Sequence, residues 1–172
     1  SKSEQEHIGH VESVMKVLRE HQVYANLKKC EFHTTSVTFL GYVVSNNGLQ
    51  VDESKITTIT SWDPPTSVTE VRRFLGMCGF FRRFVRDFST IAAPMTGLLK
   101  KTSTFNWTEK CQRSFETLKA CLTTAPILAL PDFNKIFEVE CDASRLGMGV
   151  VLLQEKRAIA YYSEKFSGAI LN

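Results

Sequence analysis

The chain has 172 residues, a net charge of +3, 43% hydrophobic residues and 23% charged residues. These proportions are ordinary for one or two small globular domains with a buried core. They exclude a membrane span within these residues, because no apolar run approaches the roughly 20 residues that a span requires. The polar start, SKSEQEHIGH, lacks the apolar stretch of a signal peptide. We read it as an interior start of a longer chain, and we expect an intracellular protein with no membrane partner.

Five cysteines are spread along the chain: Cys30, Cys78, Cys111, Cys121 and Cys141. An odd number without clustering predicts free thiols in a reducing compartment. Cys30 and His33 in CEFH, with His7 and His10 in HIGH, are conceivable zinc ligands. Zinc sites usually show two tight Cys or Cys/His pairs at regular spacing, so this pattern does not favour zinc.

The first third of the chain predicts a mixed α/β region. Apolar residues at helical spacing predict an opening helix: Ile8, Val11, Val14, Met15 and Leu18. Strand-like runs follow at residues 23–28, 36–45 and 49–51, and the turn sequence NNG separates the last two. A second short helix is expected after Asp52, and the sequence WDPP breaks it.

The middle third predicts helices. Ser67 and Glu70 match a capping box ahead of an apolar run, which predicts a helix over residues 68–88. A further helix is expected over residues 91–101, and another begins near Thr108. The apolar face of this last helix consists of Cys111, Phe115, Leu118 and Leu122.

The last third predicts strands. APILALPDF is an extended, proline-punctuated linker, and residues 137–154 form two strands with a turn between them. A third strand is predicted at residues 158–163. In the first strand Glu138, Glu140 and Asp142 alternate with apolar residues, so the three carboxylates share one face. Carboxylates grouped in this way can hold a divalent metal ion.

Positive charge is concentrated in one segment of the chain. Residues 72–101 contain seven basic residues and a single acidic one, a net charge of +6 that leaves −3 for the remainder. The basic residues are Arg72, Arg73, Arg82, Arg83, Arg86, Lys100 and Lys101. This distribution indicates a local surface that faces a polyanion.

Within the predicted helix 68–88, the apolar and basic residues separate. The apolar side consists of Phe74, Cys78, Phe81, Val85 and Phe88, and the other side carries Arg72, Arg82, Arg83 and Arg86. Gly76 and Gly79 fall on the arginine side, where each costs about 1 kcal/mol relative to alanine. Close approach of a nucleic-acid groove would explain why glycines occur here. The forked arginine side chains would then donate hydrogen bonds to its phosphates. The alternative is a solvated helix whose glycines fit a neighbouring helix. Phe80 lies near the polar arc, where an exposed ring could stack on sugars or bases.

Several strings occur together and in order: NLKKCEF, FLGYVVS, VRRFLGMCGFFRRFVRDFSTIAAPMTGLLKK, FNWTEKCQRSFETLKACLTTAPILALPDF and FEVECDAS. In combination they resemble the pol polyprotein of gypsy-type LTR retrotransposons and, more distantly, retroviral reverse transcriptase. The resemblance covers nearly the whole chain. It implies that residues 1–60 are the end of the palm, 61–125 the helical thumb or connection, and 126–172 the opening strands of an RNase H domain.

The resemblance also implies roles for individual residues. A primer-grip hairpin would contain Phe39, Leu40, Gly41 and Tyr42. The helix with Gly76 and Phe80 would follow the minor groove of a template–primer duplex, which favours the nucleic-acid interpretation of the arginine face. Asp142 would be the first metal-binding carboxylate of RNase H, and Cys141 stands where the family usually has threonine. Glu138 and Glu140 are then solvated strand residues.

The chemistry of the family is incomplete in this chain. The polymerase YxDD motif is absent, and the further RNase H carboxylates are expected from elements that follow the first strands. Two-metal cleavage needs enough carboxylates to hold both ions about 4 Å apart. The parent enzyme would use Mg²⁺, and we expect none for this fragment alone.

The expected fold class is α/β plus α, with a palm remnant, a helical thumb and an incomplete RNase H-like β-sheet. The apolar run at residues 150–153 would need cover on both faces, so an exposed apolar face and an unpaired edge are expected. The first functional hypothesis is a reverse transcriptase fragment that grips an RNA–DNA hybrid or DNA duplex without catalysing a reaction.

Two further hypotheses remain open. In the first, the chain is a domesticated interaction module that docks a host protein, the rest of the polyprotein or a second copy through a β edge at residues 148–153. In the second, a partner supplies the missing carboxylates and assembles an active nuclease.

Overall fold

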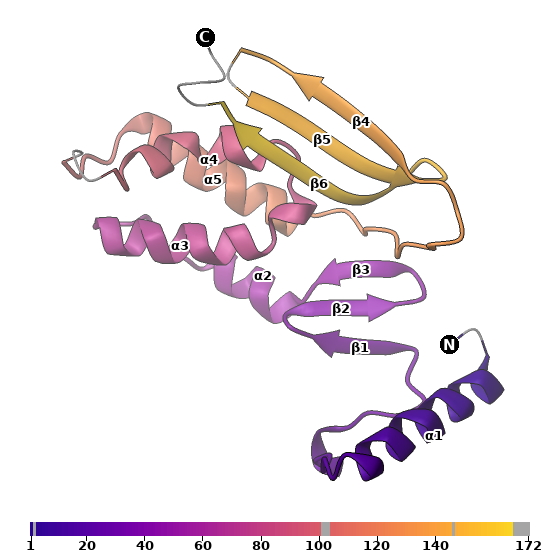
Figure 1. The fold of residues 1–172 in the computed structure, drawn as a ribbon. Helices are drawn as coiled ribbons and strands as arrows, with labels where there is room; N and C mark the ends of the chain where they lie inside the picture. Colours follow the sequence, from indigo (N-terminus) through magenta and orange to yellow (C-terminus); the bar gives the residue numbers. More distant parts are fainter. Residues whose placement is uncertain (2, 101–103, 146, 167–172) are drawn as a thin grey trace. The chain divides into compact units, whose positions relative to one another are not determined.

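The computed structural model describes residues 1, 3–100, 104–145 and 147–166. The chain divides into two compact units, residues 1–37 and residues 38–172. Helices and two small antiparallel sheets make up the fold (Figure 1). The α/β class is therefore confirmed, and each unit is described by itself.

The first unit contains the predicted opening helix, α1 (Glu4–Glu20), whose N-cap Ser3 accepts the Glu6 amide at 3.2 Å. The predicted strand at residues 23–28 is wrong. A short 3-10 helix, η1 (Leu27–Lys29), forms there because the Asn26 side chain accepts the Lys28 amide at 3.1 Å. Local capping therefore outweighs the β propensity of the run.

The second unit begins with a three-stranded sheet in the order β1 (Ser36–Phe39), β2 (Tyr42–Ser45) and β3 (Gly48–Val51), with β1 spanning the boundary between the units. The predicted strand at residues 36–45 is two strands, because Leu40 and Gly41 have positive φ angles of 51° and 77°. Two such residues form a tight hairpin turn. The predicted NNG turn between β2 and β3 is confirmed.

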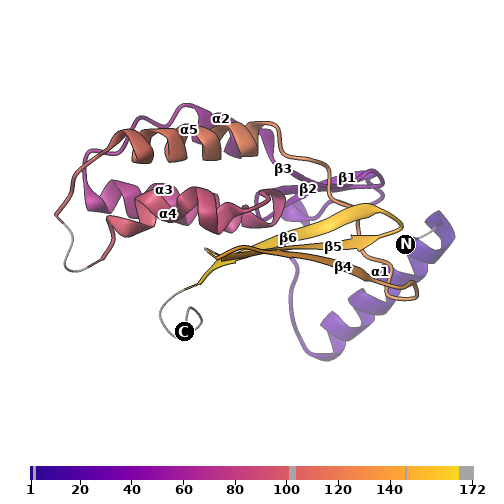
Figure 2. The same ribbon diagram turned by 90° about the horizontal axis from the view of Figure 1, so that it is seen from above.

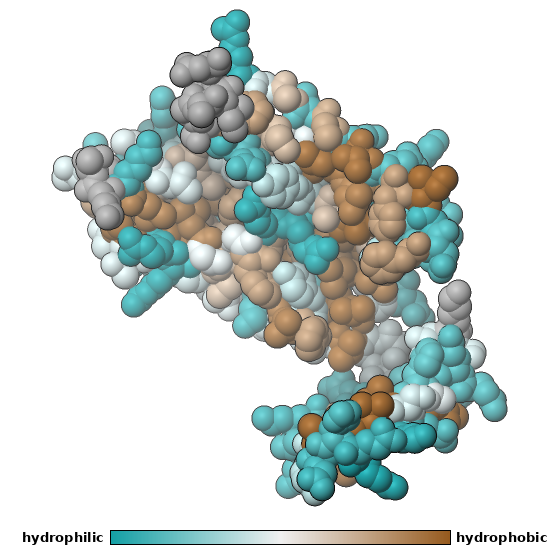
Figure 3. All heavy atoms as spheres, viewed as in Figure 1, coloured by the Kyte–Doolittle hydropathy of each residue, from teal (hydrophilic) through white to brown (hydrophobic). Residues whose placement is uncertain are grey.

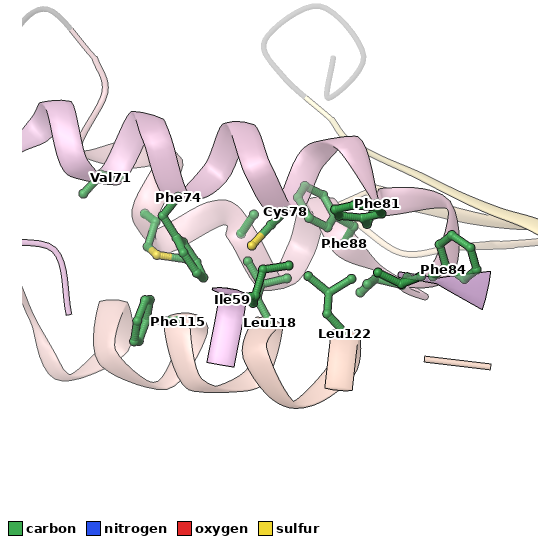
Figure 4. Close-up of a cluster of buried hydrophobic side chains, with 14 of the residues drawn as sticks. Ile59, Val71, Phe74, Cys78, Phe81, Phe84, Phe88, Phe115, Leu118 and Leu122 are labelled. Carbon is green, nitrogen blue, oxygen red and sulfur yellow. The ribbon is translucent and has the colours of Figure 1, made fainter. Parts of the chain in front are cut away.

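Four α-helices and one 3-10 helix complete the helical elements of unit two. They are α2 (Glu53–Thr60), α3 (Val68–Phe80), η2 (Arg82–Phe84), α4 (Phe88–Gly97) and α5 (Glu109–Thr123). Figure 2 shows α2 and α5 in one layer and α3 and α4 in the next. The two layers enclose an apolar core (Figure 4). Phe74 and Phe115 meet there with ring centroids 4.6 Å apart. The predicted apolar face of α5 is confirmed, since Cys111, Phe115, Leu118 and Leu122 are all buried.

The predicted helix over residues 68–88 is too long. The helix ends at Phe80, and Asp87 has a positive φ of 57° just before α4 begins. Phe81, Phe84, Val85 and Phe88 are all buried and keep helical spacing, so the spacing does not mark the break. The chain leaves the helix through the i→i+3 hydrogen bonds of η2, in which the Phe84 and Val85 amides donate to the Phe81 and Arg82 carbonyl oxygens, both at 3.0 Å.

The start of α3 confirms half of the predicted capping box. The Ser67 hydroxyl accepts the Glu70 amide at 3.3 Å. The Glu70 carboxylate accepts from the amide and hydroxyl of Thr66, at 2.7 and 2.9 Å. These hydrogen bonds lower the pKa of Glu70.

The second sheet has the order β4 (Glu138–Ala143), β5 (Gly147–Gln154) and β6 (Arg157–Lys165), all antiparallel. β6 is its nearest strand to α4, and β4 is the farthest (Figure 1). Apolar side chains gather over this sheet on the face seen in Figure 3. Val139 is 60% exposed and Tyr162 46% exposed, which confirms the expected apolar exposure.

The predicted linker APILALPDF is extended and also joins the two sheets. Leu128 pairs with Leu49 of β3 through hydrogen bonds of 2.8 and 3.0 Å, and the Ala129 amide donates to Ala158 of β6 at 2.7 Å. Leu128 is fully buried. This segment is therefore part of the packed unit.

Candidate nucleic-acid interface

Tyr42 joins the FLGY hairpin to the end of α3. Its ring stacks on Phe80 with centroids 5.2 Å apart and an interplanar angle of 22°. Its hydroxyl donates to the Phe80 carbonyl oxygen at 2.9 Å. Burial raises the pKa of Tyr42, against the opposing charge of Arg83, so the phenol keeps the proton that it donates. Two segments that the sequence assigned to nucleic-acid contact thus form one continuous surface.

The hairpin presents an apolar tip. Phe39 is 63% exposed and Leu40 65% exposed. Gly41 lies close to the helical layer, because a Cβ there would approach Cζ of Phe81 at 3.3 Å. The glycine therefore provides the turn conformation and the close approach, while the two apolar side chains beside it remain accessible to a partner.

The outer face of α3 is open at its glycines. A Cβ at Gly76 or Gly79 would have no heavy atom within 4 Å, in the part of the chain that the structure describes. Among the described residues, therefore, no neighbouring helix packs on these glycines, as the alternative interpretation required. Phe80, one turn after Gly76, is 50% exposed. A bare helix backbone and a half-exposed ring lie next to each other on one surface.

The predicted arginines do not share one helix. Arg72 lies exposed on α3, whereas Arg83 and Arg86 lie exposed in the segment after it. Arg82 is half-buried, and its Nη2 donates to the Ser163 carbonyl oxygen of β6 at 2.7 Å. Its guanidinium also lies over the rings of Phe88 and Tyr162, at 5.8 and 5.2 Å from their centroids.

This placement decides which arginines can be reversed in charge without disturbing the fold. A glutamate at position 82 would face the Ser163 carbonyl oxygen without a donor between them, which is costly at a half-buried position. Arg83 and Arg86 are the exposed pair that can be changed without breaking this contact.

The acidic stripe lies on β4. Glu138, Glu140 and Asp142 pair with Leu153, Val151 and Gly149 of β5, and all three are exposed. The predicted shared face is confirmed by this regular register. In the described residues no group of three or more His, Cys, Asp or Glu side chains could hold a metal ion, whether at Asp142 or among Cys30, His7, His10 and His33.

All five cysteines are free, as expected, and burial raises the pKa of Cys78 to about 12. In the described ranges, no helix combines the length and the apolar character needed to cross a membrane.

Sequence reasoning missed the residues that join the helices to the second sheet. Ser89 and Ser163 are small polar residues without a motif, and Gly149 reads as an ordinary strand glycine. Their contacts come from segments more than 60 residues apart, so only the tertiary structure reveals them.

Comparisons with known proteins agree with the sequence resemblance. A family model described as the RNase H-like domain found in reverse transcriptase matches residues 107–172. The Tf2-3 and Tf2-4 transposon polyproteins of Schizosaccharomyces pombe are each 37% identical over 177 aligned residues. That alignment covers the whole of this chain and 13% of each polyprotein.

Solved structures of similar fold are complexes of the foamy viral protease-reverse transcriptase. One, with double-stranded DNA, has a TM-score of 0.86 and 27% identity, and covers 99% of this chain and 31% of the viral chain. Another, with an RNA/DNA hybrid, has a TM-score of 0.85 and 26% identity, and covers 99% and 24%. The resemblance of this chain to a segment of gypsy-type LTR retrotransposon polyproteins is therefore confirmed over its full length.

Proposed function

We propose that this chain is the part of a retrotransposon reverse transcriptase that grips the template–primer duplex. The observation that carries the proposal is the contact between Tyr42 and Phe80, which unites the FLGY hairpin and the open face of α3. Similar solved structures hold double-stranded DNA and an RNA/DNA hybrid, which supports a duplex as the ligand.

In this proposal the surface supplies two kinds of contact. Gly76 and Gly79 let the helix backbone approach a minor groove, and Phe80 packs on sugars or base edges beside them. Arg72, Arg83 and Arg86 meet phosphates around that groove. Phe39, Leu40, Gly41 and Tyr42 meet the primer end. Contacts to phosphate do not read sequence, so the grip is expected to tolerate any template.

We infer no catalytic step from these residues. Asp142 matches the first RNase H carboxylate by resemblance, yet it lies exposed on β4 without a second and third donor among the described residues. That arrangement does not fit a Mg²⁺ pair, which needs several carboxylates. The Mg²⁺ chemistry therefore belongs, in this proposal, to the parent polyprotein, of which this chain spans a small part.

Fluorescence anisotropy with a labelled RNA–DNA hybrid, measured across a salt series, tests the grip. Binding is expected to weaken linearly in a log–log plot. The Arg83→Glu, Arg86→Glu double variant is expected to bind more weakly and to lose about 2 from the salt slope, roughly one per phosphate contact.

The matched control carries the same charge change on α1, as Lys16→Glu with Arg19→Glu. Both residues are exposed in the first unit. This control is expected to retain most of the affinity. Equal losses of affinity in both double variants would show that the binding is nonspecific charge attraction and would contradict the proposed grip.

The second candidate function is docking of a protein through a sheet edge. It is favoured by β4, which is exposed at all six positions and pairs only with β5 among the described residues. The edge was expected at residues 148–153, but these lie in β5, the middle strand, so that expectation is wrong. Absence of hybrid binding at low salt, from a folded sample, would make docking at β4 the leading account.

A further inference from the structure

Ser163 of β6 connects the second sheet to the segment that follows α3. The residue is 2% exposed, and three donors meet it. The Ser89 amide donates to its hydroxyl at 2.9 Å, and the Ser89 hydroxyl donates to its carbonyl oxygen at 2.7 Å. Arg82 donates to the same carbonyl oxygen at 2.7 Å. A buried acceptor with this many partners fixes its strand firmly.

A close approach of the Asp87 side chain adds to this attachment one strand further into the sheet. Gly149 of β5 pairs with Ser163 on one side and with Asp142 on the other. A Cβ at Gly149 would lie 2.6 Å from Oδ1 of Asp87, so a larger residue here would require the Asp87 side chain to shift. Asp87 stands between Arg82 and Ser89 in the chain. The cross-strand row of Asp142, Gly149 and Ser163 is therefore held against residues 82–89.

We propose that Arg82, Ser89 and Ser163, named here the β6 lock, are positioning residues that fix β4 relative to the outer face of α3. The proposal rests on the proposed function, because it gives the lock the role of setting the distance between the duplex-binding face of α3 and β4, the strand that carries Asp142. Arg82 thereby acts through protein contacts, while Arg83 and Arg86 remain free for phosphate.

The geometry favours a spacing role over general stabilisation. The lock residues lie outside the apolar core that holds α3, α4 and α5 together. The Arg82 side chain has its ring contacts with Phe88 of α4 and Tyr162 of β6, one on each side of the junction. Loss of the lock is therefore expected to loosen the sheet on the helices while each keeps its own packing.

The test measures the distance distribution between two spin labels by pulsed electron resonance on the full chain. One label is on the native Cys141, beside Asp142, and the other is on Arg73→Cys of α3. Both positions are exposed. Cys30 and Cys121 are replaced by alanine, and the buried Cys78 and Cys111 remain.

The unaltered lock is expected to give one narrow distribution. Arg82→Gln with Ser163→Ala is expected to broaden or shift it, and the exposed control Arg113→Gln is expected to leave it unchanged. If that double variant does not fold, the single variant Ser163→Ala, which removes only the hydroxyl that accepts the Ser89 amide, is measured in its place. Distributions that superimpose on the unaltered one, in a folded lock variant, would overturn the proposal.

Hybrid binding measured on the same samples separates the two ideas. A lock variant is expected to broaden the distribution and still bind the hybrid, because Gly76, Phe80, Arg83 and Arg86 are unchanged. A chain that binds no hybrid but responds to the lock changes would contradict the proposed function and leave the positioning of β4 by the lock supported.

Discussion

Tyr42 and Phe80 hold each other in two ways, through stacked rings and through a hydrogen bond from the Tyr42 hydroxyl to the Phe80 carbonyl oxygen at 2.9 Å. That carbonyl belongs to the last residue of α3, where helix carbonyls lack partners within the helix. The hairpin therefore caps the end of α3. The same pair fixes the angle at which the hairpin meets the open face of the helix.

The first prediction separates the two halves of this contact. Tyr42→Phe keeps the stacked ring and removes the hydrogen bond, so the free energy of unfolding is expected to fall by about 0.5–1.5 kcal/mol. Hybrid affinity should change little. Tyr42→Ala also removes the ring and should weaken hybrid binding, because the hairpin is no longer fixed to α3. Urea unfolding and anisotropy measure the two quantities. Equal hybrid affinities for the alanine and phenylalanine variants would contradict the shared surface.

The second prediction concerns the open glycine face. Gly76→Leu places a good helix former in the interior of α3 where nothing crowds it, and is expected to stabilise the fold by up to about 1 kcal/mol. The same side chain would stand between the helix backbone and a duplex, so hybrid binding should weaken. A variant that gains stability and loses binding cannot be explained by unfolding.

Gly9→Leu is the matched control for this experiment. Gly9 also lies inside a helix, α1, with nothing within 4 Å of a Cβ. It should gain similar helix stability and keep hybrid binding. Thermal unfolding and anisotropy on both variants decide the matter, and undiminished binding by Gly76→Leu would argue against a duplex on this face.

Local patterns predicted the elements that depend on neighbouring residues. The apolar face of α5, from Cys111 to Leu122, follows from a spacing that is visible within four turns, and the structure buries it as expected. The end of α3 at Phe80 was missed because Phe81, Phe84, Val85 and Phe88 keep helical spacing, so their burial is expected whether the helix continues or breaks. Periodicity alone continued the helix through them.

The candidate site likewise contains features that the sequence predicted and contacts that it did not. The exposure of Phe80 and the open glycines followed from their place on the helix surface. Arg82 looked equivalent to Arg83 in the sequence, yet Ser163, 81 residues away, binds it. No local signal distinguishes two adjacent arginines, so the structural role of Arg82 depends on a contact that only the folded chain makes.

The third prediction addresses the bridge between the two sheets. Gly48 has a φ of 131°, and a Cβ there would collide with the Leu128 carbonyl oxygen. Gly48→Ala is expected to lower the free energy of unfolding by about 2–5 kcal/mol, since backbone strain and overpacking act together. Gly97→Ala, at the open end of α4, is the control and should change it by no more than about 1 kcal/mol. Urea unfolding compares the two variants, and similar losses of unfolding free energy would contradict the close contact between Gly48 and Leu128.

The fourth prediction uses the lowered pKa of Glu70. The Thr66 amide and hydroxyl donate to its carboxylate and hold the pKa below the ordinary glutamate value. A pKa that is lower in the folded chain means that the unfolded chain binds the proton more tightly, so the carboxylate stabilises the fold above the ordinary pKa. This stabilisation is lost as the pH falls through the lowered pKa. Glu70→Gln should therefore be less stable than the unaltered chain at neutral pH, and the difference should shrink under acid conditions.

Urea unfolding of both proteins at a series of pH values from neutral to acid measures that difference. Glu116→Gln on α5 is the matched control, since its exposed carboxylate accepts only from the Gln112 side chain, at 2.8 Å, among the described contacts. A stability gap for Glu70→Gln that stays constant down to acid pH would show that the Thr66 hydrogen bonds do not depend on the charge. A gap that closes for Glu70→Gln alone would establish the charged cap at the start of α3, the helix whose far end presents Phe80.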